Sequence, residues 1–353
     1  MTESAFEQLA EALNRLPNGF PRTKSGVEIR ILKKIFPPEQ AALACQLTGK
    51  FEPVDAIAQR AGKPSDEISR QLFKMTRSGM VWLDRVDGQV CFRLAPFVVG
   101  VYEAQVELMD HELAHLVEDY FAEGGSQGIM GPQPAMQRVV PAMNTVKAEA
   151  ILPYEDVRAI LLSAKTFNVN DCICRIQQDE IGSPCKFPVH VCLNFSGSER
   201  NPRPGDISQA EALSLLEQSE QVGLVHTVSN VMEGVGYVCN CCGCCCGILR
   251  GITEYGIENS VAYANYYAVI DTQFCANCGN CIERCQVGAI SEGEGCSVVD
   301  RSRCIGCGLC VSGCPNNVAR LERKAEAELV SPPKDFAEWE HARLVNRGLI
   351  AAD

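Results

Sequence analysis

Apolar residues recur at helical spacing in four short segments of the first eighty positions. These segments are 28–36, 38–47, 54–62 and 65–79. Pro37 and Pro38 separate the first two, because proline ends one helix and suits the first turn of the next. In the last segment we expect Ser65 to cap the helix and Gly79 to end it. The front of the chain is therefore predicted to be a group of short amphipathic helices.

Residues 81–96 contain two apolar runs around Asp87-Gly88, a pair that strongly predicts a tight β-hairpin. Helices followed by such a hairpin are the order of a winged helix. Winged helices bind DNA through their third helix, but they also dock proteins or dimerise. Residues 54–96 carry seven basic and five acidic side chains, an excess too small to require DNA binding.

Residues 100–123 have the apolar spacing of a longer helix. Its inward face is expected to consist of Leu108, Leu113, Leu116 and Tyr120. The stretch also contains His111-Glu112-Leu113-Ala114-His115, the two-histidine pattern of zinc peptidases, with Glu112 as the base. No convincing third ligand follows with the context of that family. We therefore favour an ordinary amphipathic helix over a zinc site.

Residues 124–142 are rich in Gly, Pro and Gln, so we expect a linker or an exposed loop there. The predicted fold class is α+β and multidomain. The expected layout is a helical, winged-helix-like domain at 1–123, a linker at 124–142, a cysteine-rich α+β domain at 143–264, a ferredoxin-like two-cluster domain at 265–325 and a helical tail at 326–353.

Composition changes this picture through the cysteines. The 353 residues include 21 of them, and only Cys45 and Cys91 lie before position 172. No apolar run is long enough to span a membrane and no signal peptide is evident, so we expect a cytoplasmic protein. Because a reducing compartment disfavours disulfides, this density of cysteine predicts bound metal. The net charge of −12 argues against broad attraction to nucleic acid or anionic membranes.

Two runs of four cysteines in the last quarter of the chain carry the strongest signal. Both have the spacing Cys-x2-Cys-x2-Cys-x3-Cys, and they are Cys275, Cys278, Cys281 and Cys285, then Cys304, Cys307, Cys310 and Cys314. The pattern resembles the bacterial two-cluster ferredoxins, in which the fourth cysteine of each run binds the other run's cluster. The resemblance implies two [4Fe-4S] clusters. One would be held by Cys275, Cys278, Cys281 and Cys314, the other by Cys304, Cys307, Cys310 and Cys285.

Residues beside these runs agree with the resemblance. Glycines next to the cysteines relieve crowding and let backbone N–H groups approach the sulfurs; they are Gly279, Gly306 and Gly308. The pairs Ala289-Ile290 and Val318-Ala319 are at the positions where the family covers each cluster with small apolar residues. Gln286 departs from the family, which commonly has proline at that position.

A second cysteine-rich block occupies residues 172–246. Its ten members are Cys172, Cys174, Cys185, Cys192, Cys239, Cys241, Cys242, Cys244, Cys245 and Cys246. Adjacent cysteines point in different directions, so the loop 239–246 cannot give all six of its thiolates to one tetrahedral ion. We expect one or two further iron-sulfur centres, with zinc or metal-free thiols as alternatives. Arg175 is a candidate donor to such an anionic centre.

Between the two halves of this block, Ser208 and Glu211 predict a capped helix that ends at Gly223 and leads into a strand at 224–228. This helix and strand are expected to bring the Cys172 and Cys239 regions together. The Gly19–Glu28 opening, the Cys172 element and the cysteine loop make the whole chain similar to multidomain proteins known only as 4Fe-4S dicluster domain-containing proteins or ferredoxin-type oxidoreductase components.

These features predict an iron-sulfur electron-transfer protein or reductase component. Its ferredoxin clusters would exchange single electrons with a redox partner protein, and the middle block would be a relay or the end of the path. The front domain would dock that partner or a second copy of the chain as a homodimer. Two alternatives stay open: a redox-sensing transcription regulator that uses the winged helix, and a reductase whose middle centre binds substrate.

Overall fold

The computed structural model describes residues 2–146 and 151–352. These residues form two compact units that differ from the expected layout. The first unit comprises residues 1–132, 173–184 and 343–353, and the second comprises 133–172 and 185–342. The middle block is therefore not one continuous domain, because residues 173–184 belong with the front of the chain.

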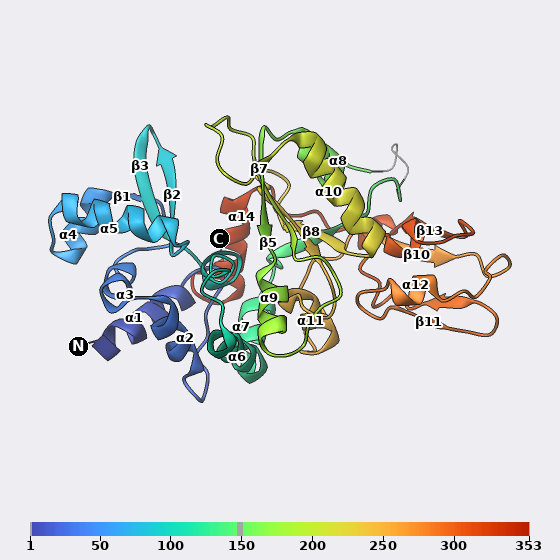
Figure 1. The fold of residues 1–353 in the computed structure, drawn as a ribbon, viewed down its shortest axis with the longest axis horizontal. Coiled ribbons are helices and arrows are strands. Elements are labelled where there is room, and N and C mark those ends of the chain that lie inside the picture. Colours follow the sequence, from blue (N-terminus) through green and yellow to red (C-terminus); the bar gives the residue numbers. More distant parts are fainter. Residues whose placement is uncertain (1, 147–150, 353) are drawn as a thin grey trace. The chain divides into compact units, whose positions relative to one another are not determined.

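The front of the first unit contains five helices and a small sheet (Figure 1, blue to cyan). The helices are α1 (Thr2–Asn14), α2 (Val27–Ile35), α3 (Pro38–Ala44), α4 (Val54–Ala61) and α5 (Ser65–Arg77). The strands are β1 (Glu52–Pro53), β2 (Val81–Val86) and β3 (Gln89–Leu94), in the order β1-β3-β2. The four predicted helices and the hairpin are thus confirmed as elements. The winged-helix assignment stays a prediction.

Backbone angles explain the hairpin turn, but the predicted helix cap at Ser65 is wrong. Asp87 and Gly88 have positive φ angles of 50° and 80°, which the two central residues of a tight hairpin turn require. Ser65 does not cap α5, because the residue before the helix is Pro64 and makes no side-chain cap. The Ser65 hydroxyl instead donates to a carboxylate oxygen of Asp55 at 2.6 Å.

The helix expected at 100–123 is much shorter. Helix α6 runs from His111 to Tyr120, and the Asp110 carboxylate caps it by accepting from the Leu113 N–H. Leu108 precedes the helix and is exposed, so its expected inward position was wrong. Both histidines are exposed, and Glu112 is paired with Lys34 at 2.7 Å. This favours the ordinary surface helix over a zinc site.

The linker expected at 124–142 is also wrong. It contains helix α7 (Ser126–Met130) and strand β4 (Gln137–Val140), and all four residues of the strand are buried. The division between the two units falls at residues 132 and 133 within this stretch. Its Gly and Pro residues therefore shape turns between packed elements.

The residues after 326 are not a separate tail. Helix α14 (Phe336–Asn346) is anchored within each unit. In the second unit the Trp339 indole N–H donates to the Ala135 carbonyl at 2.9 Å. In the first unit the fully buried Arg343 donates to the Pro17 and Ile129 carbonyls at 3.0 and 2.8 Å.

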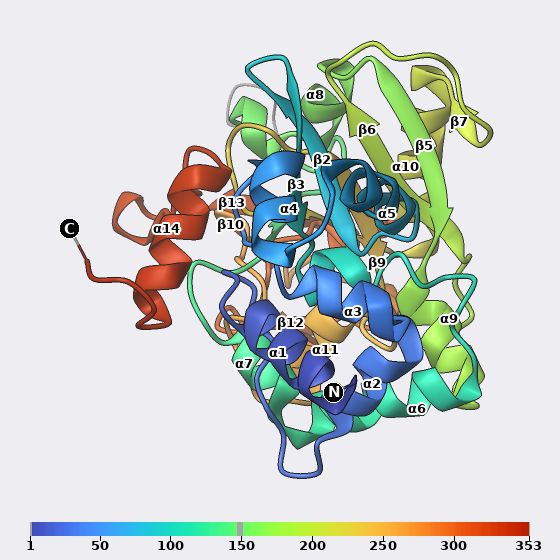
Figure 2. The same cartoon turned by 90° about the vertical axis from the view of Figure 1, so that its left-hand side faces the viewer.

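A six-stranded antiparallel sheet is the centre of the second unit, in the order β4-β8-β9-β6-β5-β7. Its other strands are β5 (Thr166–Asp171), β6 (His190–Ser196), β7 (Asp206–Ile207), β8 (Val225–Ser229) and β9 (Tyr237–Cys241). Helices α8 (Val157–Leu162) and α10 (Gln209–Val222) pack on one face, as Figure 2 shows for β5, β6 and α10. The core there includes Leu193, Val228 and Val238.

Helix α10 begins and ends as predicted. Ser208 and Glu211 form a reciprocal capping box, and Gly223 ends the helix at a φ of 95°. Strand β8 follows directly. Helix α9 (Ile173–Glu180) lies in the first unit and α11 (Gly247–Thr253) in the second. None of the helices that the structure describes is long and apolar enough to cross a membrane.

The ferredoxin-like part of the second unit is built from two similar halves. Its elements are β10 (Tyr266–Ile270), α12 (Asn280–Glu283), β11 (Ile290–Glu292), β12 (Ser297–Val299), α13 (Leu309–Ser312) and β13 (Ala319–Arg323). Strand β10 pairs with β13, and β11 pairs with β12, both antiparallel. Each pairing joins a strand of the first half, β10 or β11, to a strand of the second half, β13 or β12. The two halves therefore hold each other in place.

Candidate metal centres

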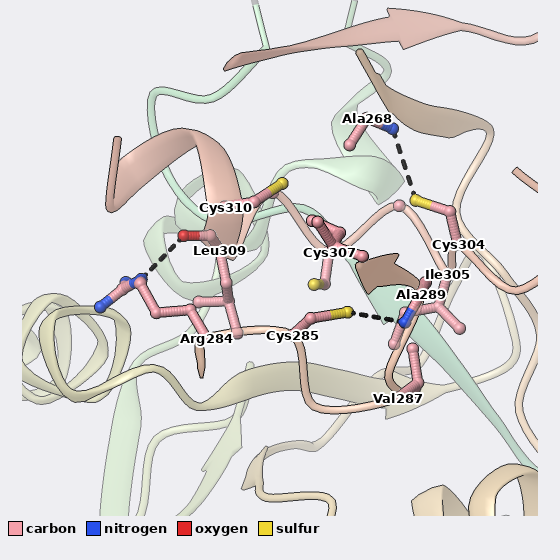
Figure 3. A pocket seen from close by; sticks show the side chains of 13 residues that line it. Ala268, Arg284, Cys285, Val287, Ala289, Cys304, Ile305, Cys307, Leu309 and Cys310 are labelled. Atoms are coloured by element: carbon pink, nitrogen blue, oxygen red, sulfur yellow. Dashed lines mark hydrogen bonds between the residues drawn. The ribbon is translucent and has the colours of Figure 1, made fainter. Parts of the chain in front are cut away.

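Four cysteines from both ferredoxin runs line one cavity. They are Cys285, Cys304, Cys307 and Cys310. Figure 3 shows them on different sides of this space, with Arg284 and Leu309 at its rim. Ala289 and Ile290 line the same cavity, where the resemblance expected small apolar residues. One run thus contributes three thiols and the other run contributes the fourth.

Backbone N–H groups point at the sulfurs of this cavity. The Ala289 N–H donates to Cys285 Sγ at 3.1 Å, and the Ala268 N–H donates to Cys304 Sγ at 3.4 Å (Figure 3). Gly306 permits the close approach of β10, since a Cβ there would lie 2.4 Å from the Tyr266 carbonyl oxygen. Such donors stabilise a negatively charged cluster.

The four remaining ferredoxin cysteines line a second cavity. They are Cys275, Cys278, Cys281 and Cys314, with Val318 and Ala319 beside them. Burial raises the pKa of the Cys314 thiol, but backbone N–H groups that include those of Val318 and Ala319 outweigh it, so the net pKa is lowered. This cysteine is therefore predisposed to the thiolate form that binds iron.

Four thiols of the middle block form a compact group, which we call the thiol quartet. They are Cys185, Cys242, Cys244 and Cys245, and their sulfurs all lie within 4.8 Å of one another. The Cys185 sulfur is 3.7 Å from that of Cys242 and 3.5 Å from that of Cys244. Metal–sulfur bonds of about 2.3 Å place the sulfurs of a tetrahedral ion about 3.8 Å apart. The quartet thus has the spacing of a single bound ion.

The ionisation of the quartet follows from this crowding. Contact with Cys242 is the main cause that raises the pKa of Cys244 to about 12, and the same contact raises the pKa of Cys245. Neighbouring thiolates repel one another, so the unbound thiols hold their protons. A bound cation removes this repulsion, and the quartet should release protons when it binds metal.

The other middle-block cysteines are divided between the two units. Cys174 and Arg175 lie on α9 in the first unit, and the role expected of Arg175 stays a prediction. The remaining five belong to the second unit and are Cys172, Cys192, Cys239, Cys241 and Cys246. Contacts with Cys239 and Cys246 lower the pKa of Cys241 to about 6, while contacts with Cys192 and Cys241 raise that of Cys239.

Comparison with known proteins bears on one part of the chain. The family model described as a 4Fe-4S binding domain matches residues 268–291 and again 297–320. The chain carries two tandem 4Fe-4S motifs. No curated protein and no solved structure matches the chain. The middle block and the front must therefore be interpreted from their own residues.

Gln286 connects this 4Fe-4S domain to the middle block. Its side-chain oxygen accepts the Gly243 N–H at 2.8 Å, and its side-chain nitrogen donates to the Gly223 carbonyl at 2.9 Å. A Cβ on Gly243 would lie 1.9 Å from the Gln286 carbonyl oxygen, so the two backbones are in contact. Gln286 follows Cys285, while Gly243 lies between Cys242 and Cys244. The sequence marked Gln286 as unusual but gave no sign of its partner.

Arg284 is a second functional residue that sequence reasoning missed. Arg284 is among the residues that line the first cavity, and its guanidinium donates to the Leu309 carbonyl at 2.9 Å and the Glu220 carbonyl at 2.6 Å. Burial lowers the pKa of this arginine, although the neighbouring thiolates of Cys307 and Cys310 oppose the change. Arginine remains charged at neutral pH, so it brings a positive charge to the edge of the cavity.

Proposed function

We propose that the protein passes single electrons between a redox partner and a thiolate-bound metal centre in the middle block, by way of two [4Fe-4S] clusters. The Gln286 bridge is the observation that carries this proposal. It joins the residue after Cys285 to the loop that supplies Cys242 and Cys244, through one hydrogen bond of 2.8 Å. Because electron tunnelling weakens steeply with distance and is favoured along bonds, this contact is a suitable route between the sites.

The chemistry requires a metal that changes charge by one electron. Each transfer oxidises one centre and reduces the next by a single electron, with no bond made or broken. Zinc cannot take part, because it has no accessible redox state. Iron bound by thiolates can, so we propose iron in the thiol quartet. The partially exposed position of the quartet, with Cys244 exposed and Cys242 buried, would then suit it to exchange electrons beyond the chain.

The front of the chain has a docking role in this proposal. Its helices and hairpin would bind the redox partner or a second copy of the chain. Its weak basic excess favours these protein partners over DNA. A redox-sensing regulator is the alternative, and DNA binding that changes with cluster oxidation would favour it. We further propose a cytoplasmic location, where reduced thiols are maintained.

Gln286→Leu tests the bridge directly. It removes both side-chain hydrogen bonds while the ferredoxin cysteines stay in place. We expect the variant to keep its 4Fe-4S spectra but to reduce the middle centre several-fold more slowly, because the tunnelling route loses its hydrogen bond and must cross a gap between non-bonded atoms. Stopped-flow absorption after mixing with a one-electron reductant measures this rate.

Gln273→Leu is the matched control, because Gln273 is exposed in the same domain and its substitution should leave the rate unchanged. Equal rates in Gln286→Leu and the parent chain would contradict the proposed route. A middle block that never changes its spectrum during reduction would contradict the proposed function itself.

A further inference from the structure

The cysteines of strand β9 outside the quartet lie on one face of the sheet. Side chains alternate between the two faces along a strand. Val238 belongs to the core under α10, and Asn240 points the same way, since its side-chain oxygen is 2.6 Å from His226 Nδ1. His226 Nε2 in turn lies 3.0 Å from Glu220 of α10. Cys239 and Cys241 therefore face the opposite side.

The neighbouring strand adds a third thiol to this face. Strands β6 and β9 pair antiparallel with Leu193 opposite Val238, so the next position places Cys192 opposite Cys239. Cys192 is also the neighbour that raises the pKa of Cys239 most, and Cys241 adds to that effect. Three thiols thus lie in a row across two strands.

Two further cysteines lie near these three thiols. Cys246 precedes α11, and it is among the neighbours that lower the pKa of Cys241. Cys172 follows β5, where its N–H donates to the Val189 carbonyl at 2.9 Å, and its charge acts on Cys241. We call these five residues the sheet-face thiols. They come from three separate segments of the chain, so the tertiary fold has assembled them.

Two buried polar residues lie beside the sheet-face thiols. The Thr227 hydroxyl lies 3.5 Å from Cys241 Sγ, and the Gln137 amide donates to Cys239 Sγ at 3.8 Å. Thr227 in turn donates to the Gln137 side-chain oxygen at 3.0 Å, which fixes the orientation of that amide. Thr227 is fully buried and Gln137 is 4% exposed. The buried Gln137 amide is a donor of the kind that stabilises metal-bound thiolates.

We propose that the sheet-face thiols hold a second middle-block centre, an iron-sulfur cluster bound by Cys192, Cys239, Cys241 and Cys246, with Cys172 beside it. Five thiols in an extended row exceed the four ligands of a tetrahedral ion. The proposal deepens the proposed function and rests on it for the cluster's role in electron transfer. It also explains the adjacent pairs Cys241-Cys242 and Cys245-Cys246, since each pair divides its thiols between this centre and the quartet.

Metal and sulfide analysis of the anaerobically purified full chain tests this assignment. Cys239→Ser/Cys241→Ser should lose iron and acid-labile sulfide in equal amounts, because clusters contain both. Cys242→Ser/Cys244→Ser should lose one metal ion and no sulfide. Both variants should keep the electron paramagnetic resonance signals of the two ferredoxin clusters, which also show that the chain has folded. Cys296→Ser, outside both groups, is the control and should match the parent chain.

Two outcomes would overturn the assignment. Unchanged iron and sulfide in Cys239→Ser/Cys241→Ser would show that the sheet-face thiols bind no cluster. Loss of one common spectroscopic signal in both double variants would show a single shared centre. Should the double variant fail to fold, Cys192→Ala decides, since it removes one half-buried thiol. An unaltered spectrum in Cys192→Ala contradicts the proposal.

Failure of this assignment is distinct from failure of the proposed function. Metal and sulfide contents do not depend on electron flow. A chain with the expected metal in both groups but no electron transfer between its centres would contradict only the proposed function. A chain that transfers electrons to the quartet, yet loses no sulfide in Cys239→Ser/Cys241→Ser, would contradict only the proposal of a second centre.

Discussion

The ferredoxin cysteines and the thiol quartet are both groups of four thiols, but they are spaced differently. The four thiols of each ferredoxin group lie around a cavity of their own, whereas the quartet closes to sulfur–sulfur contacts of 3.5–3.7 Å. A cubane places irons and sulfides between its ligands, while a single ion needs only a small central gap. Thiol spacing therefore indicates how many metal atoms each group is built to hold.

The two groups also differ in how the chain constructs them. Each ferredoxin run supplies three thiols from one tight loop, so the local spacing nearly fixes the site. The quartet joins Cys185 to a loop 57 positions later, through strands that pair in the tertiary fold. A substitution in a ferredoxin loop should thus remove one cluster without disturbing the rest of the chain. A change in the sheet should disturb the middle block more broadly.

Loss of a ferredoxin ligand should have the largest effect. We expect Cys307→Ser to lose one cluster, about four irons, because Cys307 lines the first cavity beside Cys285, Cys304 and Cys310. Because the free energy of metal binding adds to the stability of the folded chain, thermal unfolding should begin at a markedly lower temperature. Iron analysis and calorimetry measure both quantities.

Cys244→Ser is the comparison, since Cys244 is an exposed member of the quartet. It should lose one ion and lower the unfolding temperature less. Equal losses of iron and of stability in the two variants would remove the distinction between a cluster cavity and a single-ion site.

A smaller effect on stability is expected where the middle block contacts the 4Fe-4S domain. Gly243→Ala would place a methyl group 1.9 Å from the Gln286 carbonyl oxygen, so the loop must shift. We expect a destabilisation of about 1–3 kcal/mol, together with slower reduction of the middle centre. Gly197→Ala is the control, because nothing lies within 4 Å of its added methyl group. A Gly243→Ala chain as stable as Gly197→Ala would show that the contact is not tight.

The smallest effect should be a change of potential. Arg284→Gln removes a positive charge at the rim of the first cavity, and reduction adds negative charge to the cluster there. We expect the reduction potential of that cluster to fall by roughly 50 mV, the scale of a screened charge interaction. Arg284→Lys should recover most of the loss. Redox titration followed by electron paramagnetic resonance distinguishes this from a rise or from no change.

The sequence predicted the elements whose signals are local. Asp87-Gly88 marked the hairpin, Ser208 and Glu211 marked the start of α10, and the cysteine spacing marked the 4Fe-4S motifs that the family model matches. Each of these signals depends on residues a few positions apart. Geometry at this range follows from backbone preferences alone.

Features that depend on tertiary packing were missed. Gly and Pro residues made 124–142 resemble a linker, although β4 within it pairs with β8 and is buried. The end of the chain looked like a tail because nothing in its sequence reveals that Arg343 is buried among carbonyl groups. The Gln286–Gly243 contact joins positions 43 residues apart, and no periodicity could predict it.

Counting iron and acid-labile sulfide per chain after anaerobic purification, with Mössbauer spectra of the same sample, tests the central claim most directly. Two ferredoxin clusters account for about eight irons and eight sulfides. We predict more iron than this, including thiolate-bound iron whose spectrum disappears in Cys242→Ser/Cys244→Ser. About eight irons, all in [4Fe-4S] form and unaffected by that variant, would contradict an electron path into the middle block.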